Sequence, residues 1–324
     1  MDVLVLGGTS FVGRAVVDAL LTRGHSPTLF TRGITNPDLF PDVLRRRGDR
    51  DAGDYASLDG SSWDAVVDVS AYHPRHVGQA IDAAPAGRYL FISTVSVYDV
   101  PRCPEEGLTE DAALLPEVRD TEEVTNDTYG GLKVACETDL RRRLGDRATI
   151  VRPGIVAGPH DTTDRFTYWA RRASQGGRVA LPGRPEQPVQ VIDSRDLANL
   201  CAQLLEDDRL GTFNAVGPAV PVSMAELIAT CAQAGSTTAE VVPVPLVERT
   251  PPFPLVLDDP NDDRMFRSSS AAARAVGLTA TSLLDTALDT AAWDAERGAP
   301  PIPRAFTPEQ EQAALAGSPV REAP

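Results

Sequence analysis

Tyr129 and Lys133 are the two residues whose types and spacing most directly suggest chemistry. They lie four residues apart in the segment Tyr129-Gly-Gly-Leu-Lys133, which places a phenol and an ammonium on one face of a helix. A phenol titrates near pH ~10, so proton transfer at neutral pH requires its pKa to fall to about 7. A neighbouring ammonium favours the phenolate and would supply much of that decrease. The pair therefore predicts acid–base catalysis.

Lys133 is also the single lysine among the 31 lysines and arginines of the chain. Enrichment in arginine, alanine, glycine and proline is typical of proteins from high-GC bacteria and accounts for the missing lysines. It does not account for the one that remains, because most surface lysines can become arginine at little cost. Lys133 therefore indicates a position that needs a compact ammonium, and we expect arginine to fit there poorly.

Hydroxyl side chains gather in the segment Ser93-Thr94-Val95-Ser96-Val97-Tyr98, directly after a predicted strand. Ligands bind outside the carboxyl ends of strands in open α/β sheets. A hydroxyl here could hold a substrate oxygen while Tyr129 exchanges its proton. Serine and threonine also begin loops that have no chemical role, so the residues alone leave both interpretations open.

The segment Gly7-Gly8-Thr9-Ser10-Phe11-Val12-Gly13 joins the first predicted strand to the first predicted helix. A dinucleotide pyrophosphate needs a tight turn, close approach of the main chain and free N–H groups at a helix start. Gly7 would supply the turn and Gly13 would let the helix lie close to the sheet. Ser10 replaces the usual middle glycine, but it is small and can donate to phosphate. The position of the motif predicts a dinucleotide site.

Arg32 follows the second predicted strand, where proteins that bind NAD place a carboxylate against the ribose hydroxyls. No carboxylate follows until Asp38. A carboxylate would repel a 2′-phosphate, whereas a guanidinium could bind it. We therefore expect NADP(H) as the cofactor, with NAD as the alternative.

Short apolar runs alternate with helical patterns over the first 155 residues, which predicts a doubly wound parallel sheet. Beyond Pro153 the pattern loosens, and we expect Ser194 and Ser223 each to cap a helix. The region from Pro243 to Pro260 is proline-rich and reads as an extended loop. We expect strands at residues 3–6, 28–30, 65–69, 89–92, 149–151 and 189–192, a poorly marked strand before Gly48, helices at about 11–24, 75–84, 129–144, 270–276 and 283–296, and a short helix from Thr307 before a frayed tail.

Composition excludes several classes of protein. The net charge of −15 argues against nucleic acid and anionic membrane surfaces as partners. Four widely spaced cysteines favour reduced thiols and a cytoplasmic location, and no apolar run is long enough to cross a membrane. His73 and His76 share a helical face, but nothing nearby completes a metal site, so we interpret them as surface histidines and expect no metal.

These motifs together resemble the extended short-chain dehydrogenase/reductase superfamily, which includes the NAD-dependent epimerase/dehydratase family. The resemblance runs to about Gly298, and the segments RPGIVAGP from Arg152, PVQVIDSRDLA from Pro188 and GTFNAVGP from Gly211 extend it. It implies that Tyr129 is the general acid/base, that Lys133 activates it and that Thr94 completes the triad. It also implies a homodimer formed through the Tyr129 helix, and cofactor contacts at Gly7, Thr9, Ser10, Phe11, Val12, Gly13, Arg32, Asp49, Arg50, Ser70, Ala71, Tyr129, Lys133 and Pro153.

The fold that the resemblance implies is a Rossmann-like domain with a smaller C-terminal substrate lobe. The nucleotide domain would comprise residues 1–155 and about 187–217, and the substrate lobe residues 156–186 and 218–300. Residues 301–324 would form a short helix and a tail.

Departures from the family pattern bear on the substrate. Sugar-nucleotide members usually have asparagine at the position of Ile155 and tyrosine at that of Ala157. We therefore expect a reductase that moves hydride between NADP(H) and a carbonyl or alcohol of a small organic substrate. Alternatives are a nucleotide-sugar epimerase or dehydratase with tightly bound NAD, for which Pro182, Gly183 and Arg184 could frame a nucleotide, and a non-catalytic dinucleotide-sensing or RNA-binding relative. Residues 160–169 could form an aromatic pocket wall with one cation, or a packing helix.

Overall fold

A seven-stranded parallel sheet forms the larger part of the protein in the computed structural model, which describes residues 1–104, 107–245 and 253–317. Its strand order, β11-β6-β5-β4-β1-β2-β3, makes it Rossmann-like, as expected. The poorly marked third strand is β3, which ends directly before Gly48. The strands are β1 Asp2–Leu6, β2 Ser26–Thr31, β3 Leu44–Arg47, β4 Trp63–Asp68, β5 Ala86–Ile92, β6 Ala148–Pro153 and β11 Gly211–Ala215.

Both faces of this sheet are buried where its central strands carry continuous apolar runs, such as Val3 to Leu6 in β1. In β1, Val3 and Val5 pack into the core under helices α1 and α5, whereas Leu4 and Leu6 pack into the core under α2 and α3. Successive side chains of a strand point to opposite faces, so a continuous apolar run requires helices on both sides. The four helices are α1 Phe11–Thr22, α2 Pro74–Ala83, α3 Asn126–Leu144 and α5 Ser194–Glu206.

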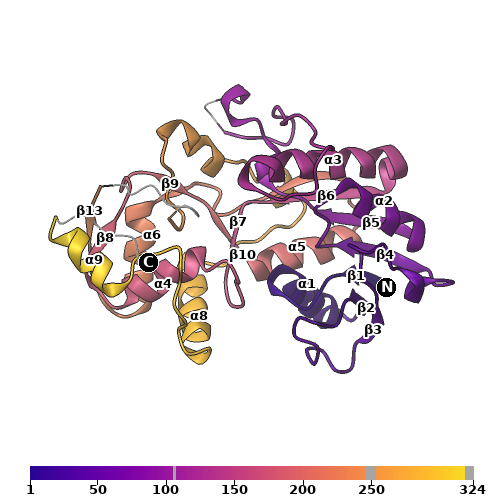
Figure 1. The fold of residues 1–324 in the computed structure, drawn as a ribbon, viewed down its shortest axis with the longest axis horizontal. Helices are drawn as coiled ribbons and strands as arrows, with labels where there is room; N and C mark the ends of the chain where they lie inside the picture. The colour runs from indigo at the N-terminus through magenta and orange to yellow at the C-terminus, as the bar shows by residue number, and fades with distance from the viewer. Residues whose placement is uncertain (105–106, 246–252, 318–324) are drawn as a thin grey trace.

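A second group of elements lies beside the sheet, on the left of Figure 1, and has its own apolar core. The pairs β8–β13 and β7–β10 are parallel, and β9–β12 is antiparallel. Strands β7 and β10 lie between this group and the sheet (Figure 1). The domain boundaries drawn from the sequence remain a proposal. The remaining strands and α-helices are β7 Ile155–Ala157, β8 Gly177–Leu181, β9 Pro188–Val189, β10 Val191–Asp193, β12 Val222–Ser223, β13 Ala239–Pro243, α4 Arg165–Ser174, α6 Met224–Ala234, α8 Leu283–Glu296, α9 Pro308–Leu315, and α7 Ala271–Ala275, which packs against the core of the sheet.

Local signals placed several helix starts correctly and one wrongly. Ser223 and Thr307 each begin a helix with a complete capping box, as expected. The cap of α5 is Asp193 rather than Ser194, because its carboxylate accepts from Arg195 N. The strand expected at residues 189–192 is divided at Gln190, whose amide bonds to Pro218 O and Ser268 O instead of continuing one ladder. Part of the expected 243–260 loop and the tail from residue 318 lie outside the described residues.

The four cysteines are free and buried. None of the helices in the described part of the chain has both the length and the apolar composition that crossing a membrane requires. Within the same residues, no three His, Cys, Asp or Glu side chains come together as a metal-binding group.

Candidate functional site

One cavity of about 1300 Å³ runs from the glycine segment at residues 7–13 to the second group of elements. The carboxyl ends of β1, β2, β4, β5 and β6 and the start of α3 border it. Thr94, Tyr129 and Lys133 all line it, and so do the residues expected to contact a nucleotide, except Ala71. The structure therefore gathers residues that are far apart in sequence along one continuous wall.

The glycine segment forms a tight turn between β1 and α1. Gly7 and Gly8 have φ angles of 112° and 101°, which favour glycine. A Cβ atom on Gly13 would lie 2.7 Å from Gly8 N, so Gly13 permits the helix to approach the turn itself, more directly than the sheet. Ser10 precedes α1 without capping it through its side chain. The N–H groups of the first turn are therefore available to a phosphate at the cavity wall.

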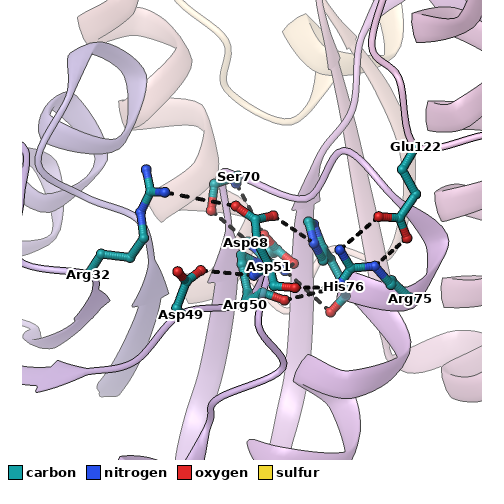
Figure 2. Close-up of polar contacts among 9 residues, drawn as sticks. All are labelled: Arg32, Asp49, Arg50, Asp51, Asp68, Ser70, Arg75, His76 and Glu122. Carbon is teal, nitrogen blue, oxygen red and sulfur yellow. Dashed lines mark hydrogen bonds and ion pairs between the residues drawn. The ribbon is translucent and has the colours of Figure 1, made fainter.

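Arg32 lies at the end of β2 with a half-exposed side chain, and its Nη1 is 3.9 Å from Asp51 Oδ2. Asp51 also faces His76, whose Nε2 is 3.1 Å from Asp51 Oδ1 (Figure 2). Arg32 thus has one distant carboxylate neighbour rather than a tight pair. A guanidinium in this position can bind a ribose phosphate.

Arg50 lines the cavity and is also buried against Asp68. Its two terminal nitrogens lie 2.7 and 2.9 Å from the two Asp68 oxygens (Figure 2). Tyr89 OH donates to the same carboxylate. Although burial opposes ionisation of Asp68, the Arg50 guanidinium holds its pKa below the usual value. Arg50 also donates to Ser70 Oγ, which in turn donates to Leu6 O. Arg50 and Ser70 therefore stiffen the cavity floor as well as lining it.

His73 and His76 are buried, so the interpretation as surface histidines is wrong. His73 precedes α2, and the two rings lie 4.9 Å apart beside the cavity. Burial, with the charges of Arg50 and Arg75, lowers the pKa of His76 to about 4. His76 is therefore neutral near pH 7.

Lys133 is 3% exposed, and two main-chain carbonyls hold its ammonium. Nζ donates to Ala71 O at 2.8 Å and to Ile92 O at 2.7 Å, and it lies 4.0 Å from the centroid of the Phe91 ring. Burial lowers the pKa of Lys133 to about 8. Ala71 thus contacts Lys133 through its carbonyl rather than lining the cavity itself. Through these two hydrogen bonds the lysine connects α3 to the segment after β4 and to the end of β5.

Tyr129 and Thr94 face each other on the same wall. The Thr94 hydroxyl donates to Ser96 Oγ at 3.2 Å and is near enough to the Tyr129 phenol to favour its ionised form, whereas the adjacent Ser93 donates to Glu137 at 2.6 Å. Burial, together with the Tyr72 phenol, raises the pKa of Tyr129 to about 12. The expectation that Lys133 lowers this pKa is therefore wrong for the structure as described, because the effect of burial dominates.

A buried polar network behind the wall was not expected from the sequence. Glu137, one turn after Lys133, accepts from Arg152 at 2.9 and 2.7 Å as well as from Ser93. Arg152 Nη1 also donates to Tyr98 OH, which donates to Asn214. The network joins α3, β6, β11 and the loop that carries Thr94. A charged residue within a buried helix face is the signal that could have revealed it.

Residues 160–169 were expected to form either a pocket wall or a packing helix, and the residues of α4 divide between these two roles. Phe166 and Trp169 are fully buried in the core of the second group, and Trp169 Nε1 donates to Pro254 O. The aromatic residues therefore pack, and no aromatic wall forms here. The cation, Arg165, does line the cavity, together with Thr162 and Thr163.

The cavity fits a nicotinamide dinucleotide. The uncapped start of α1 and its glycine turn offer N–H groups to a pyrophosphate, and Arg32, Asp49 and Asp51 lie near the end of β2, where a ribose binds in this architecture. Tyr129 and Lys133 line the same cavity from α3. The glycine segment, the residues near the end of β2 and the side chains of Thr94 and Tyr129 thus follow one another along a single cavity.

Known proteins resemble this chain in sequence, and solved structures resemble it in fold. The chain is 26% identical over 256 residues to the chloroplast stem-loop binding protein of 41 kDa b from Arabidopsis thaliana, covering 72% of this chain but only 63% of that protein. The structure of a UDP-glucose 4-epimerase matches with a TM-score of 0.71 at 16% identity, covering 92% of this chain and 98% of that one. The Bordetella bronchiseptica enzyme WbmH, solved with NAD⁺, matches with a TM-score of 0.66 at 18% identity, covering 92% and 99%.

A family model described as the NAD dependent epimerase/dehydratase family matches residues 3–216. That span includes the glycine segment, Arg32, Thr94 and the Tyr129–Lys133 pair. The chain therefore belongs to the NAD dependent epimerase/dehydratase family, within the extended short-chain dehydrogenase/reductases.

Proposed function

We propose that the protein is an NADP(H)-dependent reductase that acts on a carbonyl group of a small organic substrate. The observation that carries this proposal is that Tyr129 and Thr94 line the same cavity as the glycine segment. With its pKa near 12, Tyr129 is a neutral phenol at physiological pH. A neutral phenol donates a proton, which is what the oxygen of a carbonyl requires as it becomes an alcohol.

Each residue of the triad has a distinct part. Thr94 holds the substrate oxygen beside the phenol, and Tyr129 protonates that oxygen. Lys133 fixes α3 against the sheet and keeps a positive charge near the site. The nicotinamide, when bound, supplies the hydride; Gly7, Ser10, Gly13, Arg32, Tyr129 and Lys133 would hold the nucleotide.

Two features favour a small organic substrate over a sugar nucleotide. Arg184, which could have framed a nucleotide, is paired with Asp263 at 2.5 Å and does not line the cavity. Ile155, which does line the cavity, offers a substrate pyrophosphate no hydrogen bond from its side chain.

A spectroscopic assay tests the proposal. Purified protein is supplied with NADPH and a panel of ketones and aldehydes, and absorbance at the reduced-nicotinamide band is followed. We expect loss of NADPH in step with formation of the alcohol. Conversion of a nucleotide sugar to its epimer, without net change in absorbance, would contradict the proposal.

That contrary outcome defines the second candidate, a nucleotide-sugar epimerase with NAD. Membership of the family and the likeness to a UDP-glucose 4-epimerase favour it. The mass of the protein as purified discriminates further, because an epimerase of this kind would retain NAD. RNA binding, suggested by the name of the Arabidopsis relative, is disfavoured by the net charge of −15.

Arg32 provides a test of cofactor choice. We expect Arg32→Ser to weaken NADP⁺ binding by about tenfold or more and to leave NAD⁺ binding nearly unchanged, because a charge-assisted contact with the 2′-phosphate is lost. Asp51→Asn should act in the opposite direction, because it removes a carboxylate 3.9 Å from Arg32. Nucleotide titrations followed by tryptophan fluorescence measure both. The exposed Arg178, on β8, supplies the control Arg178→Ser. An unchanged preference in both variants would refute the role of Arg32.

A further inference from the structure

Two arginines, Arg165 and Arg304, line the cavity on the side of the second group of elements. Arg165 begins α4, and Arg304 lies between α8 and α9. Their side chains are half-buried, and they lie close enough for the charge of each to act on the other. The fold thus brings two positive charges, distant in sequence, to one wall.

Neither guanidinium has an ion-pair partner among the described residues. Arg165 Nε donates to Thr163 Oγ1 at 3.2 Å, which is a contact with a neutral group. Other arginines of the same helix are paired: Arg171 contacts Asp294, and Arg172 contacts Glu311. In a chain with 46 acidic residues, arginines without a carboxylate partner at a cavity indicate that the partner comes from outside.

Asp161 is the acid whose charge acts most on Arg165, and it does not replace such a partner. It is fully buried, does not line the cavity, and directs Oδ1 to the N–H and hydroxyl of Thr163 at 2.8 and 2.7 Å. Burial raises the pKa of Asp161, which weakens it as a counter-ion. For Arg165, burial and the charge of Arg304 together lower the pKa, so a bound anion would relieve an unfavourable environment.

Apolar side chains also line this part of the cavity. Phe253, Leu255, Val256 and Phe266 line it, each no more than 7% exposed. Arg165 is also near enough to Tyr129 for its charge to act on the phenol. An anion held by Arg165 would therefore lie in the neighbourhood of the reacting oxygen, with apolar surface around the remainder of the ligand.

We propose that Arg165 and Arg304 bind a carboxylate or phosphate of the substrate, so that the substrate is an apolar organic anion whose charged group lies near the reacting carbon. The position of the reacting carbon rests on the proposed function; the anion site does not. A guanidinium pair offers parallel N–H donors that match either oxyanion.

Binding without turnover tests this proposal. Benzoylformate, its neutral methyl ester and phenyl phosphate are titrated by calorimetry into the full chain, with no reduced nicotinamide present. We expect at least one anion to bind about tenfold or more tightly than the ester. Arg165→Met and Arg304→Met should each lower that affinity about tenfold, whereas the control Arg178→Met should leave it unchanged. Thermal unfolding of each variant verifies that it is folded.

Each outcome has a defined meaning. Preference for benzoylformate identifies a carboxylate, and preference for phenyl phosphate identifies a phosphate. Equal binding of anion and ester, no binding of either anion, or unchanged affinity in both methionine variants would overturn the proposal. Tyr129→Phe protein should still bind the anion. If it does and the wild-type protein reduces no carbonyl, the anion site stands and the proposed reaction fails. If the wild-type protein reduces carbonyls but binds neither anion, the proposed reaction stands and the anion site fails.

Discussion

Tyr129→Phe is expected to lower the rate of carbonyl reduction by about 100- to 10,000-fold, with nucleotide affinity nearly unchanged. The substitution removes one oxygen, that of the phenol that lines the cavity together with Thr94. Tyr98, which also lines the cavity, is not free to replace it, since its hydroxyl is bound to Asn214 and Arg152. Steady-state rates and nucleotide titrations on the same preparation measure both effects. A variant that retains more than about a tenth of the activity would exclude Tyr129 as the proton donor.

The pH dependence of the wild-type enzyme follows from the same groups. Tyr129, with its pKa near 12, stays protonated well above neutral pH, so its titration does not lower the rate of reduction there. Lys133, with its pKa lowered to about 8, loses its positive charge above that pH. Reduction should therefore be steady below about pH 8 and fall above it, whereas oxidation of the alcohol, which needs the phenolate, should rise with pH in the wild type and not in Tyr129→Phe.

Glu137→Leu is expected to destabilise the fold by about 3–5 kcal/mol, because it leaves Arg152 buried without its counter-ion. Both side chains are essentially inaccessible, at 0% and 1% exposed, and two hydrogen bonds join them. The Ser93 hydroxyl would lose its acceptor as well. Urea unfolding at equilibrium measures the change in the free energy of unfolding.

The double variant Glu137→Leu/Arg152→Met is the control for this prediction. It removes both charges and should recover a large part of the lost stability, since replacing a buried ion pair by apolar residues is often close to neutral. A loss below about 1 kcal/mol in Glu137→Leu, or no recovery in the double variant, would show that the pair is not responsible.

The sequence was sufficient for those features that depend on local pattern. The apolar runs of β1, β4 and β5 predicted a parallel sheet because both faces of such a strand must be covered. The glycine segment and the Tyr129–Lys133 spacing placed two parts of the site because each is confined to a few consecutive residues. The family match supports the same framework.

Features that depend on contacts between distant residues were missed or misjudged. The rise in the pKa of Tyr129 comes from burial under Tyr72 and neighbouring loops, which spacing along one helix does not reveal. The bond from Arg50 to Asp68, at the end of β4, was not expected, and the nucleotide contact predicted for Arg50 stays a prediction. Arg165 precedes α8 in the sequence and Arg304 follows it, and only the folded chain shows that both residues line one cavity.

The position of Lys133 has a consequence for reagents that react with amines. No other side chain in the sequence carries a primary amine, and this one lies in the wall of the cavity. Because its pKa is lowered to about 8, a large fraction of Lys133 is the neutral, nucleophilic form in mildly alkaline buffer. An acylating label attached to any side-chain amine of this protein therefore reports on access to the site, and its rate measures how often the bonds to Ala71 and Ile92 open. The guanidinium groups of the other cationic side chains do not react under these conditions.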